Sequence, residues 1–200
     1  AAWEENDLPD DADLAVYGAG AGDALGTAVA IGDVDGDGYD DLVTGSPLAD
    51  GEGNDWASSG EVHVFWGGDR SWVGSTRDAG TEANVTITVS DSSGTGVECG
   101  SALALVDLNG DGKDDIIMGA PSHDGGRGRV HVVFGATRGS LEGASLDMSG
   151  GDWDIRVDGE DAGEGAGGSL ACGDFDGDGI DDLAIGAPDH TYGGNSGAGR

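Results

Sequence analysis

The sequence predicts an all-β fold made of repeated blades of four antiparallel strands, the building unit of a β-propeller. Three observations support this prediction. A nine-residue acidic phrase occurs three times, at residues 33–41, 107–115 and 174–182. The repeat period is therefore roughly seventy residues, which holds four short strands with their loops and is too long for a solenoid of helix pairs. Short apolar and β-branched runs flank the acidic phrases, as in strands joined by a tight turn.

The elements follow the same order in each repeat. A strand of small residues comes first, then the acidic phrase, then a short apolar strand that ends in Gly-Ser-Pro or Gly-Ala-Pro. A glycine-rich loop leads to a third strand with alternating valines, and a longer connection leads to a fourth alternating strand. The first strand covers residues 26–30, 100–104 and 168–171, the second ends at 45–47, 119–121 and 186–188, the third lies within 60–67 and 128–135, and the fourth covers 85–89 and 153–157.

The repeats divide the chain into four segments. Residues 1–24 form an N-terminal segment that includes the outer strand of a neighbouring blade, because Leu14-Ala15-Val16 aligns with Ile155-Arg156-Val157. Residues 25–98 and 99–166 each form one blade, and residues 167–200 begin a third blade that is truncated. We therefore expect an incomplete ring, whose remaining blades come from the same longer chain or from another chain.

The acidic phrase predicts a calcium loop in the first hairpin of each blade. Asp or Asn occupies positions 1, 3, 5 and 9, and two like charges about 4 Å apart cost on the order of 4 kcal/mol at an effective dielectric near 20. A hard divalent cation removes this penalty, and Ca²⁺ accepts roughly six to eight oxygen ligands. Glycine at position 6 permits the tight turn. A solvated acidic turn is the alternative, and recurrence of the phrase in register disfavours it.

The loop differs from that of an EF-hand. An EF-hand loop requires a bidentate glutamate at position 12 and a helix on each side. Position 12 here is Thr44, Met118 or Ile185, and the flanking residues alternate like strands. Position 7 varies freely between Tyr39, Lys113 and Ile180, as expected where only the backbone carbonyl binds. The metal is thus expected at the bend of a β-hairpin.

These phrases resemble the FG-GAP repeat of integrin α-subunit propellers and of its bacterial relatives, over about residues 14–200. The calcium loop and the Gly-Ala-Pro element carry the resemblance, whereas Leu25-Gly26, Cys99-Gly100 and Gly167-Gly168 stand where the family has Phe-Gly. The resemblance implies three Ca²⁺ sites with side-chain ligands at positions 1, 3, 5 and 9 and a carbonyl ligand at position 7. These are Asp33, Asp35, Asp37, Tyr39 and Asp41; Asp107, Asn109, Asp111, Lys113 and Asp115; and Asp174, Asp176, Asp178, Ile180 and Asp182.

Charge and hydropathy restrict the partners and the compartment. The formal net charge is −32 and Lys113 is the only lysine, so nucleic acid and anionic membranes are disfavoured by repulsion. No apolar run is long enough to insert into a membrane. Resting cytosol holds too little free Ca²⁺ to fill sites of the extracellular class. We therefore expect an extracellular, cell-surface or periplasmic protein, whose signal peptide has already been removed.

Cysteine and histidine positions follow the repeat. Cys99 and Cys172 fall in apolar slots, which favours small buried side chains, although a disulfide between them stays open. His63 and His131 share one strand position, as expected of structural rather than catalytic residues. The sequence holds no nucleophile elbow, zinc-protease motif or phosphate loop. It predicts that these residues are not an enzyme.

Two functions fit these observations. The first is a calcium-binding adhesion or ligand-recognition module outside the cell, as the integrin resemblance implies. Its protein or glycan ligand would bind at the rim opposite the calcium loops, where the loop 48–59 carries Trp56; the alternative for Trp56 is packing over a blade. The second function is a structural or spacer propeller appended to a secreted enzyme or surface protein.

Overall fold

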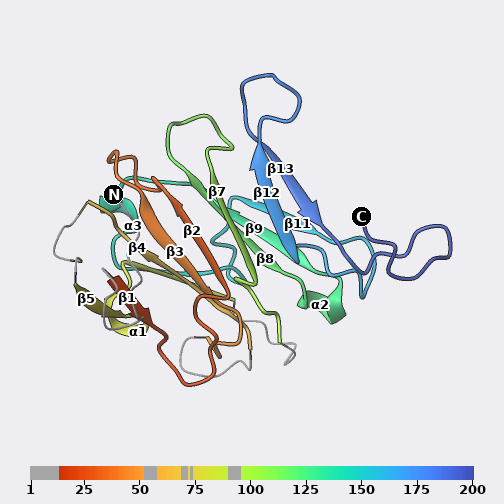
Figure 1. Cartoon of the computed structure of the whole chain (residues 1–200), viewed down its shortest axis with the longest axis horizontal. Coiled ribbons are helices and arrows are strands. Elements are labelled where there is room, and N and C mark those ends of the chain that lie inside the picture. Colours follow the sequence, from red (N-terminus) through yellow and green to blue (C-terminus); the bar gives the residue numbers. More distant parts are fainter. Residues whose placement is uncertain (1–13, 52–57, 69–71, 73, 90–95) are drawn as a thin grey trace, which may run out of the picture.

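The computed structural model describes residues 14–51, 58–68, 72, 74–89 and 96–200 of the chain. Regular structure in this part consists mainly of β-strands in four sheets, with three one-turn helices in the connections. The fold prediction is confirmed, because the sheets are propeller blades set side by side, and the described residues do not close into a ring (Figure 1).

The first blade contains four antiparallel strands in the predicted order. They lie next to one another as β2 (Ala28–Gly32), β3 (Asp41–Ser46), β4 (Glu61–Phe65) and β6 (Val85–Thr88). Side chains of a strand alternate between its two faces, so residues in register share a face. Thr44 pairs with His63, and His63 pairs with Thr86, which makes one polar row across the sheet.

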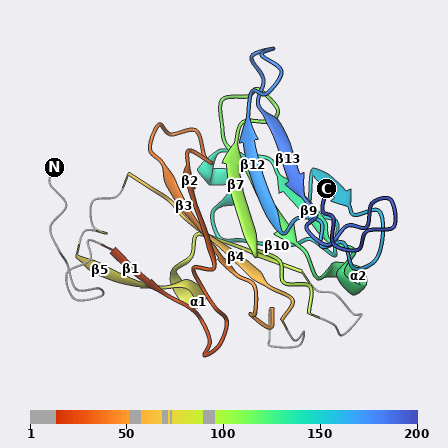
Figure 2. The same ribbon diagram turned by 45° about the vertical axis from the view of Figure 1, so that its right-hand side comes forward.

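The second blade repeats this arrangement and the third begins it. The second blade has the order β7 (Ala102–Val106), β8 (Asp115–Ala120), β9 (Arg129–Val133) and β11 (Ile155–Asp158), all antiparallel. The third contains the hairpin β12 (Ser169–Gly173) and β13 (Asp182–Gly186). The innermost strands β2, β7 and β12 lie side by side, and the three hairpin bends face the same edge of the molecule (Figures 1 and 2).

Two further strands, which the sequence did not indicate, extend these blades by parallel pairing. β10 (Ala144–Asp147), in the long connection of the second blade, pairs in parallel with β6 of the first blade. β5 (Ser75–Asp78), in the same connection of the first blade, pairs in parallel with β1 (Leu14–Tyr17). β1 therefore stands to β5 as β6 stands to β10, which is the relation of an outer strand to the connection of the next blade.

The helices are single turns within connections. They are α1 (Ala79–Glu82), α2 (His123–Gly126) and α3 (Arg138–Leu141). The side chain of Asp78 caps α1 by accepting the N–H of Gly80. None of the helices in the described part of the chain has the length and apolar character needed to cross a bilayer.

The hydrophobic core lies between the blades. Val43, Val62, Ile87 and Met118 belong to one buried cluster that joins the first blade to the second. A second cluster joins the second blade to the third, with Ile117, Val130 and Val132 buried in it. The second blade lies between the two clusters and packs both faces of its sheet against neighbours, which is why its strand β8 is apolar and buried along its length rather than alternating.

Close approach of neighbouring backbones explains one glycine in the Gly-Ala-Pro element. A Cβ atom at Gly119 would overlap the carbonyl oxygen of Gly167 in the lead-in turn of the third blade. A Cβ atom at Gly45 would overlap the carbonyl oxygen of Gly100 in the same way, one blade earlier. Only glycine lets the second strand of one blade touch the first turn of the next.

Both cysteines are free thiols. Cys99 is fully buried in the cluster between the first two blades, and burial raises the pKa of its thiol to about 12. Cys172 packs against the cluster between the second and third blades, and burial raises the pKa of its thiol too. The structure therefore joins neither to a disulfide and gives both an apolar environment.

Candidate metal centre in the acidic loops

The three acidic loops have one shared conformation, set by the carboxylate at position 1. In the first loop Asp33 Oδ1 accepts the N–H groups of Gly36 and Asp37 at 2.8 and 3.0 Å, and Asp33 Oδ2 accepts that of Gly38 at 2.9 Å. Asp107 and Asp174 accept the three equivalent N–H groups in their own loops. The position-1 aspartate is thus the centre around which each loop folds.

Glycine is required at two loop positions, of which the sequence analysis named one. Gly38 at position 6 has φ of 88°, and Gly36 at position 4 has φ of 75°. The equivalent glycines of the other two loops also have positive φ. A side chain with a Cβ atom is strained in this region, so the Asp-x-Asp-Gly-Asp-Gly order is needed for the turn itself.

The carboxylate at position 9 closes the loop against the sheet. Asp41 is fully buried; its Oδ2 accepts the N–H of Val34 at 2.9 Å and its Oδ1 accepts that of Gly67 at 2.8 Å. Asp115 accepts the corresponding N–H groups in the second blade. Asp182 accepts one, from Phe175, at 3.0 Å. Asp41 and Asp115 therefore tie their loops to the end of the third strand, in addition to any ligand role.

Burial makes the position-9 carboxylates of the first two loops, Asp41 and Asp115, costly to ionise. Desolvation raises the pKa of Asp41 to about 6, against the lowering effect of the N–H groups of Gly67 and Val34. Desolvation also raises the pKa of Asp115, again opposed by two backbone N–H groups. A cation beside these groups would favour their charged form.

The structure brings the predicted carboxylates together in the first and third loops. Oxygens of Asp33, Asp35 and Asp37 lie within 4.8 Å of one another, as do oxygens of Asp174, Asp176 and Asp182. Clustered carboxylate oxygens are the ligand type that hard divalent cations take. These two clusters therefore fit a divalent cation.

The second loop has the same fold with one amide. Asn109 Oδ1 accepts the N–H of Asp111 at 2.9 Å, and Asn109 Nδ2 lies 3.4 Å from Asp115 Oδ1. Lys113 Nζ lies 3.2 Å from Asp111 Oδ1. This loop thus has fewer carboxylates at its centre than the other two, with an ammonium group beside one of them.

Each residue at position 7 donates its backbone N–H to the carboxylate at position 5 of its loop. Tyr39 and Ile180 have exposed side chains, while their N–H groups donate to the carboxylates of Asp37 and Asp178 at 2.9 and 2.8 Å. Lys113 donates its N–H to Asp111 in the same way. Position 7 thus contributes a backbone N–H to each loop, and in the second loop the Lys113 side chain also lies beside Asp111; a carbonyl ligand at this position stays a prediction.

An arginine that the sequence analysis missed binds the first loop. Arg138 Nε lies 2.6 Å from Asp35 Oδ2 and Arg138 Nη2 lies 2.8 Å from Asp37 Oδ2. The guanidinium also stacks 5.6 Å from the ring centre of Trp66. Its hydrogen bond to Asp35 raises the pKa of Arg138 further above its already high value. One signal existed: Arg70 and Arg138 both stand four residues after an aromatic residue that ends the third-strand phrase, Trp66 or Phe134.

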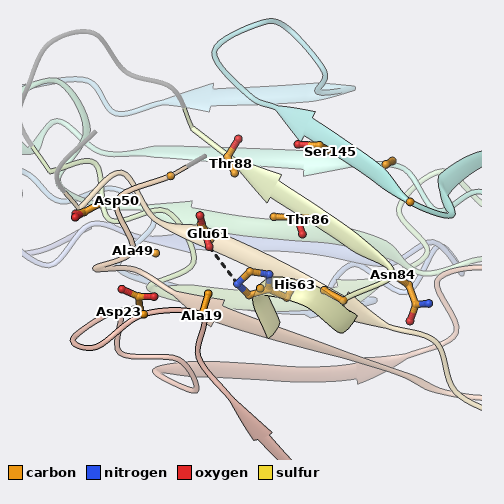
Figure 3. Close-up of a pocket in the computed structure, with 16 residues that line it drawn as sticks. Ala19, Asp23, Ala49, Asp50, Glu61, His63, Asn84, Thr86, Thr88 and Ser145 are labelled. Atoms are coloured by element: carbon orange, nitrogen blue, oxygen red, sulfur yellow. Dashed lines mark ion pairs between the residues drawn. The ribbon is translucent and has the colours of Figure 1, made fainter. Parts of the chain in front are cut away.

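A polar pocket of about 420 Å³ lies on the other side of the first blade (Figure 3). His63 lies at its centre with Nε2 3.4 Å from Glu61 Oε2, and Asp23 and Asp50 stand around it. His131 occupies the equivalent position of the second blade. It is buried there, because this face of the second blade packs against the first blade. This pocket therefore corresponds to a seam between blades. Trp56, the predicted ligand contact, lies outside the described residues.

Comparison with known proteins identifies the repeat. The model of the FG-GAP repeat matches residues 25–65, 100–133 and 166–200, which together make up more than half of the chain. The chain belongs to the FG-GAP repeat family. Each match begins at the lead-in turn of a blade and includes its acidic loop, and the first two matches end with the third strand of the blade, at residues 65 and 133.

Relatives of this FG-GAP protein include integrin α-subunits and a phospholipase. The chain is 34% identical to integrin alpha pat-2 of Caenorhabditis briggsae over 83% of its length, and 33% identical to integrin alpha-PS2 of Drosophila melanogaster over 86%. It is 33% identical to the phosphatidylinositol-glycan-specific phospholipase D of Rattus norvegicus over 82%. It spans only 13%, 12% and 18% of these three relatives, respectively.

Proposed function

We propose that this chain is a calcium-loaded propeller module that works outside the cell in adhesion or ligand recognition and has no catalytic role of its own. The observation that carries this proposal is the shared loop conformation, in which the backbone folds around one carboxylate and gathers further carboxylates beside it. A loop that only needed to be soluble would not require the same hydrogen bonds in three blades.

Calcium would be held by the same positions in all three loops. The proposed ligands are Asp33, Asp35, Asp37, Asp41 and the Tyr39 carbonyl in the first loop, with the equivalent residues 107, 109, 111, 113 and 115, and 174, 176, 178, 180 and 182, in the others. The ion would supply charge neutralisation and would crosslink the ends of two strands. Extracellular calcium modules bind the ion with dissociation constants of roughly 10⁻⁴ to 10⁻³ M, and a compartment outside the cytosol supplies enough Ca²⁺ to fill sites of that class.

Thermal unfolding tests the calcium step directly. Binding to the folded state alone stabilises it by mass action, so the midpoint should rise by several degrees between chelator and millimolar Ca²⁺. Asp174→Asn combined with Asp176→Asn should reduce this rise, because these substitutions remove two carboxylates from an exposed cluster. Equal midpoints with chelator and with Ca²⁺ would refute calcium binding by the chain.

A second function rests on the phospholipase relatives. Those relatives are named as enzymes. In a protein of that kind, the propeller of this chain would serve as a spacer or assembly unit joined to a separate catalytic part. Binding of the calcium-loaded chain to protein and glycan arrays discriminates the two. Retention of a defined ligand at the rim opposite the acidic loops supports recognition, and a silent array together with a catalytic domain in the full reading frame supports the spacer.

A further inference from the structure

The first acidic loop is covered by a segment of the second blade. This segment, the strap, comprises residues 137–147 and includes α3 and β10. β10 pairs with β6 along the outer edge of the first blade. Glu142 Oε2 accepts the indole N–H of Trp66 at 2.6 Å, and Glu142 Oε1 accepts an amide N–H of Asn84 at 3.2 Å. The strap is thus fixed to the first blade at several points, and Arg138 stands at its start.

Arg138 occupies the oxygens that the loop itself does not use. Oδ1 of Asp35 accepts the N–H of Asp37, and Oδ1 of Asp37 accepts the N–H of Tyr39. The two remaining oxygens, Oδ2 of Asp35 and of Asp37, both bind the guanidinium of Arg138. The side chain of Asp35 has 0% exposed surface in this arrangement, so a hydrated cation cannot reach it while Arg138 stays in place.

The third loop shows the same carboxylates without such a cover. Asp176 Oδ1 accepts the N–H of Asp178, and Asp178 Oδ1 accepts that of Ile180, as in the first loop. No arginine or lysine of the described residues pairs with either side chain there, and both aspartates are exposed. In the first loop, the Oδ2 atoms that the loop leaves unused are therefore bound by a segment of the following blade and not by residues of the loop itself.

We propose that Arg138 is an internal cation that competes with the divalent cation for the first acidic loop. The inference rests on the proposed calcium function. Arginine binding and cation binding to Asp35 and Asp37 are mutually exclusive, so each weakens the other by the same factor. In the cation-free protein Arg138 offsets part of the negative charge of the first loop, and filling of the loop releases the start of the strap from the first blade.

Calorimetric titration with Ca²⁺ tests the competition. The second and third loops are disabled with Asp111→Ala and Asp178→Ala, so that the heat comes from the first loop. Adding Arg138→Gln should tighten Ca²⁺ binding roughly tenfold or more, because it removes a charge-assisted pair to a buried carboxylate. The matched control is Arg156→Gln, since Arg156 also stacks on a tryptophan, Trp153, and pairs with an aspartate, Asp158. It should change the affinity by less than about twofold, as expected of a screened surface charge.

The outcomes separate this proposal from the proposed function. Equal affinities of the two arginine variants, or weaker binding by Arg138→Gln, would overturn the competition while leaving calcium binding intact. A first loop that binds no Ca²⁺ even with Arg138→Gln would overturn it as well. Absence of Ca²⁺ binding by the unmodified chain at every loop would refute the proposed function instead.

Limited trypsin digestion of the unmodified chain gives a second readout, which does not depend on the variant folding. Trypsin cuts after arginine, and Arg138 bound to the loop is held away from the protease. We expect Ca²⁺ to raise the rate of cleavage after Arg138 relative to cleavage after Arg127, which pairs with Asp124 of the α2 turn and serves as internal reference. An unchanged or lower ratio would contradict release of the strap.

Discussion

Asp33 and Asp114 hold two acidic loops together through reciprocal hydrogen bonds. The N–H of Asp114 donates to the carbonyl of Asp33 at 2.8 Å, and the N–H of Asp33 donates to Asp114 Oδ2 at 2.9 Å. Asp33 is position 1 of the first loop and Asp114 is position 8 of the second. The loops are therefore part of the contact between blades, and their conformation is linked to blade packing.

This contact predicts a stability role for Asp114 that its loop position alone does not suggest. Asp114→Ala leaves the N–H of Asp33 without its acceptor in a partly buried place, which should cost about 1–2 kcal/mol of unfolding free energy. For a chain of this size the thermal midpoint should fall by roughly 2–4 °C per kcal/mol. Melts with chelator measure this effect without a contribution from bound cation.

Asp181→Ala is the matched control, because Asp181 is position 8 of the third loop and makes no equivalent bond to Asp107 among the described residues. Its midpoint should stay close to that of the unmodified chain. A drop of the same size in both variants would mean that position 8 acts within its own loop rather than between blades.

Close backbone contact at Gly119 of β8 predicts that a larger residue there destabilises the chain. A methyl group there meets the carbonyl of Gly167 in the next blade, and backbone on both sides leaves little room to relax. Gly119→Ala should therefore destabilise the chain by about 2 kcal/mol or more. Gly139→Ala is the comparison, since nothing lies within 4 Å of a Cβ atom at Gly139 in α3, and it should be neutral or slightly stabilising. Denaturant midpoints of both variants check the difference, and similar losses at the two positions would contradict it.

The order of strands in a blade and the hairpin loops could be predicted because the residues that determine them lie within a single repeat. Each strand has its own apolar run, and the loop needs glycine and aspartate at fixed positions for its turn, as Gly38 and Asp33 show. The strand order, the loop positions and the equivalent strand positions of His63 and His131 could therefore be predicted from the sequence. Site occupancy and blade number are not of this kind and stay predictions.

Contacts between repeats could not be predicted in this way. β5 and β10 are short and largely polar, and their parallel pairing depends on which outer strand the preceding blade presents. In the sequence little distinguishes Arg138 from other surface arginines, because its partners belong to the first blade and become known only from the packing of the two blades. Its contact with Asp35 spans 103 positions of the chain, and no periodicity within a repeat encodes such a distance. The carboxylates of the loop could be predicted from the sequence, whereas the arginine that pairs with them could not.

His131 in β9 should make the folding stability of the chain sensitive to acid. His131 is 1% exposed, and neither ring nitrogen has a hydrogen-bond partner among the described residues. Burial lowers the pKa of His131 from 6.5 to about 3, with smaller lowering effects from Arg129, His123 and Arg156 and an opposing one from Asp158. The folded state therefore keeps this histidine neutral, while the unfolded state takes up a proton below pH 6.5.

The contribution of neutral His131 to the unfolding free energy is then fully present above pH 6.5. It is lost as the pH falls toward 3, because the unfolded state binds more protons than the folded state in this pH range. Between pH 6.5 and about pH 5 the loss should reach about 2 kcal/mol. The raised pKa values of Asp41, Asp114 and Asp115 act in the opposite direction, because these groups gain stability on acidification. Whole-protein pH curves therefore mix the two contributions, and only a comparison of variants isolates that of His131.

His131→Leu removes the titrating group and should make the unfolding free energy, measured with denaturant and chelator, about 2 kcal/mol less sensitive to acidification over that range. Met118→Leu alters the cross-strand partner of His131 but keeps the imidazole, so its pH dependence should match that of the unmodified chain. Parallel pH curves for all three proteins would show that His131 is not the buried neutral base that its position indicates. The expected result is a constant difference between the His131→Leu curve and the others above pH 6.5, where the histidine is neutral in both folded and unfolded states, and a difference that changes as the pH falls below it.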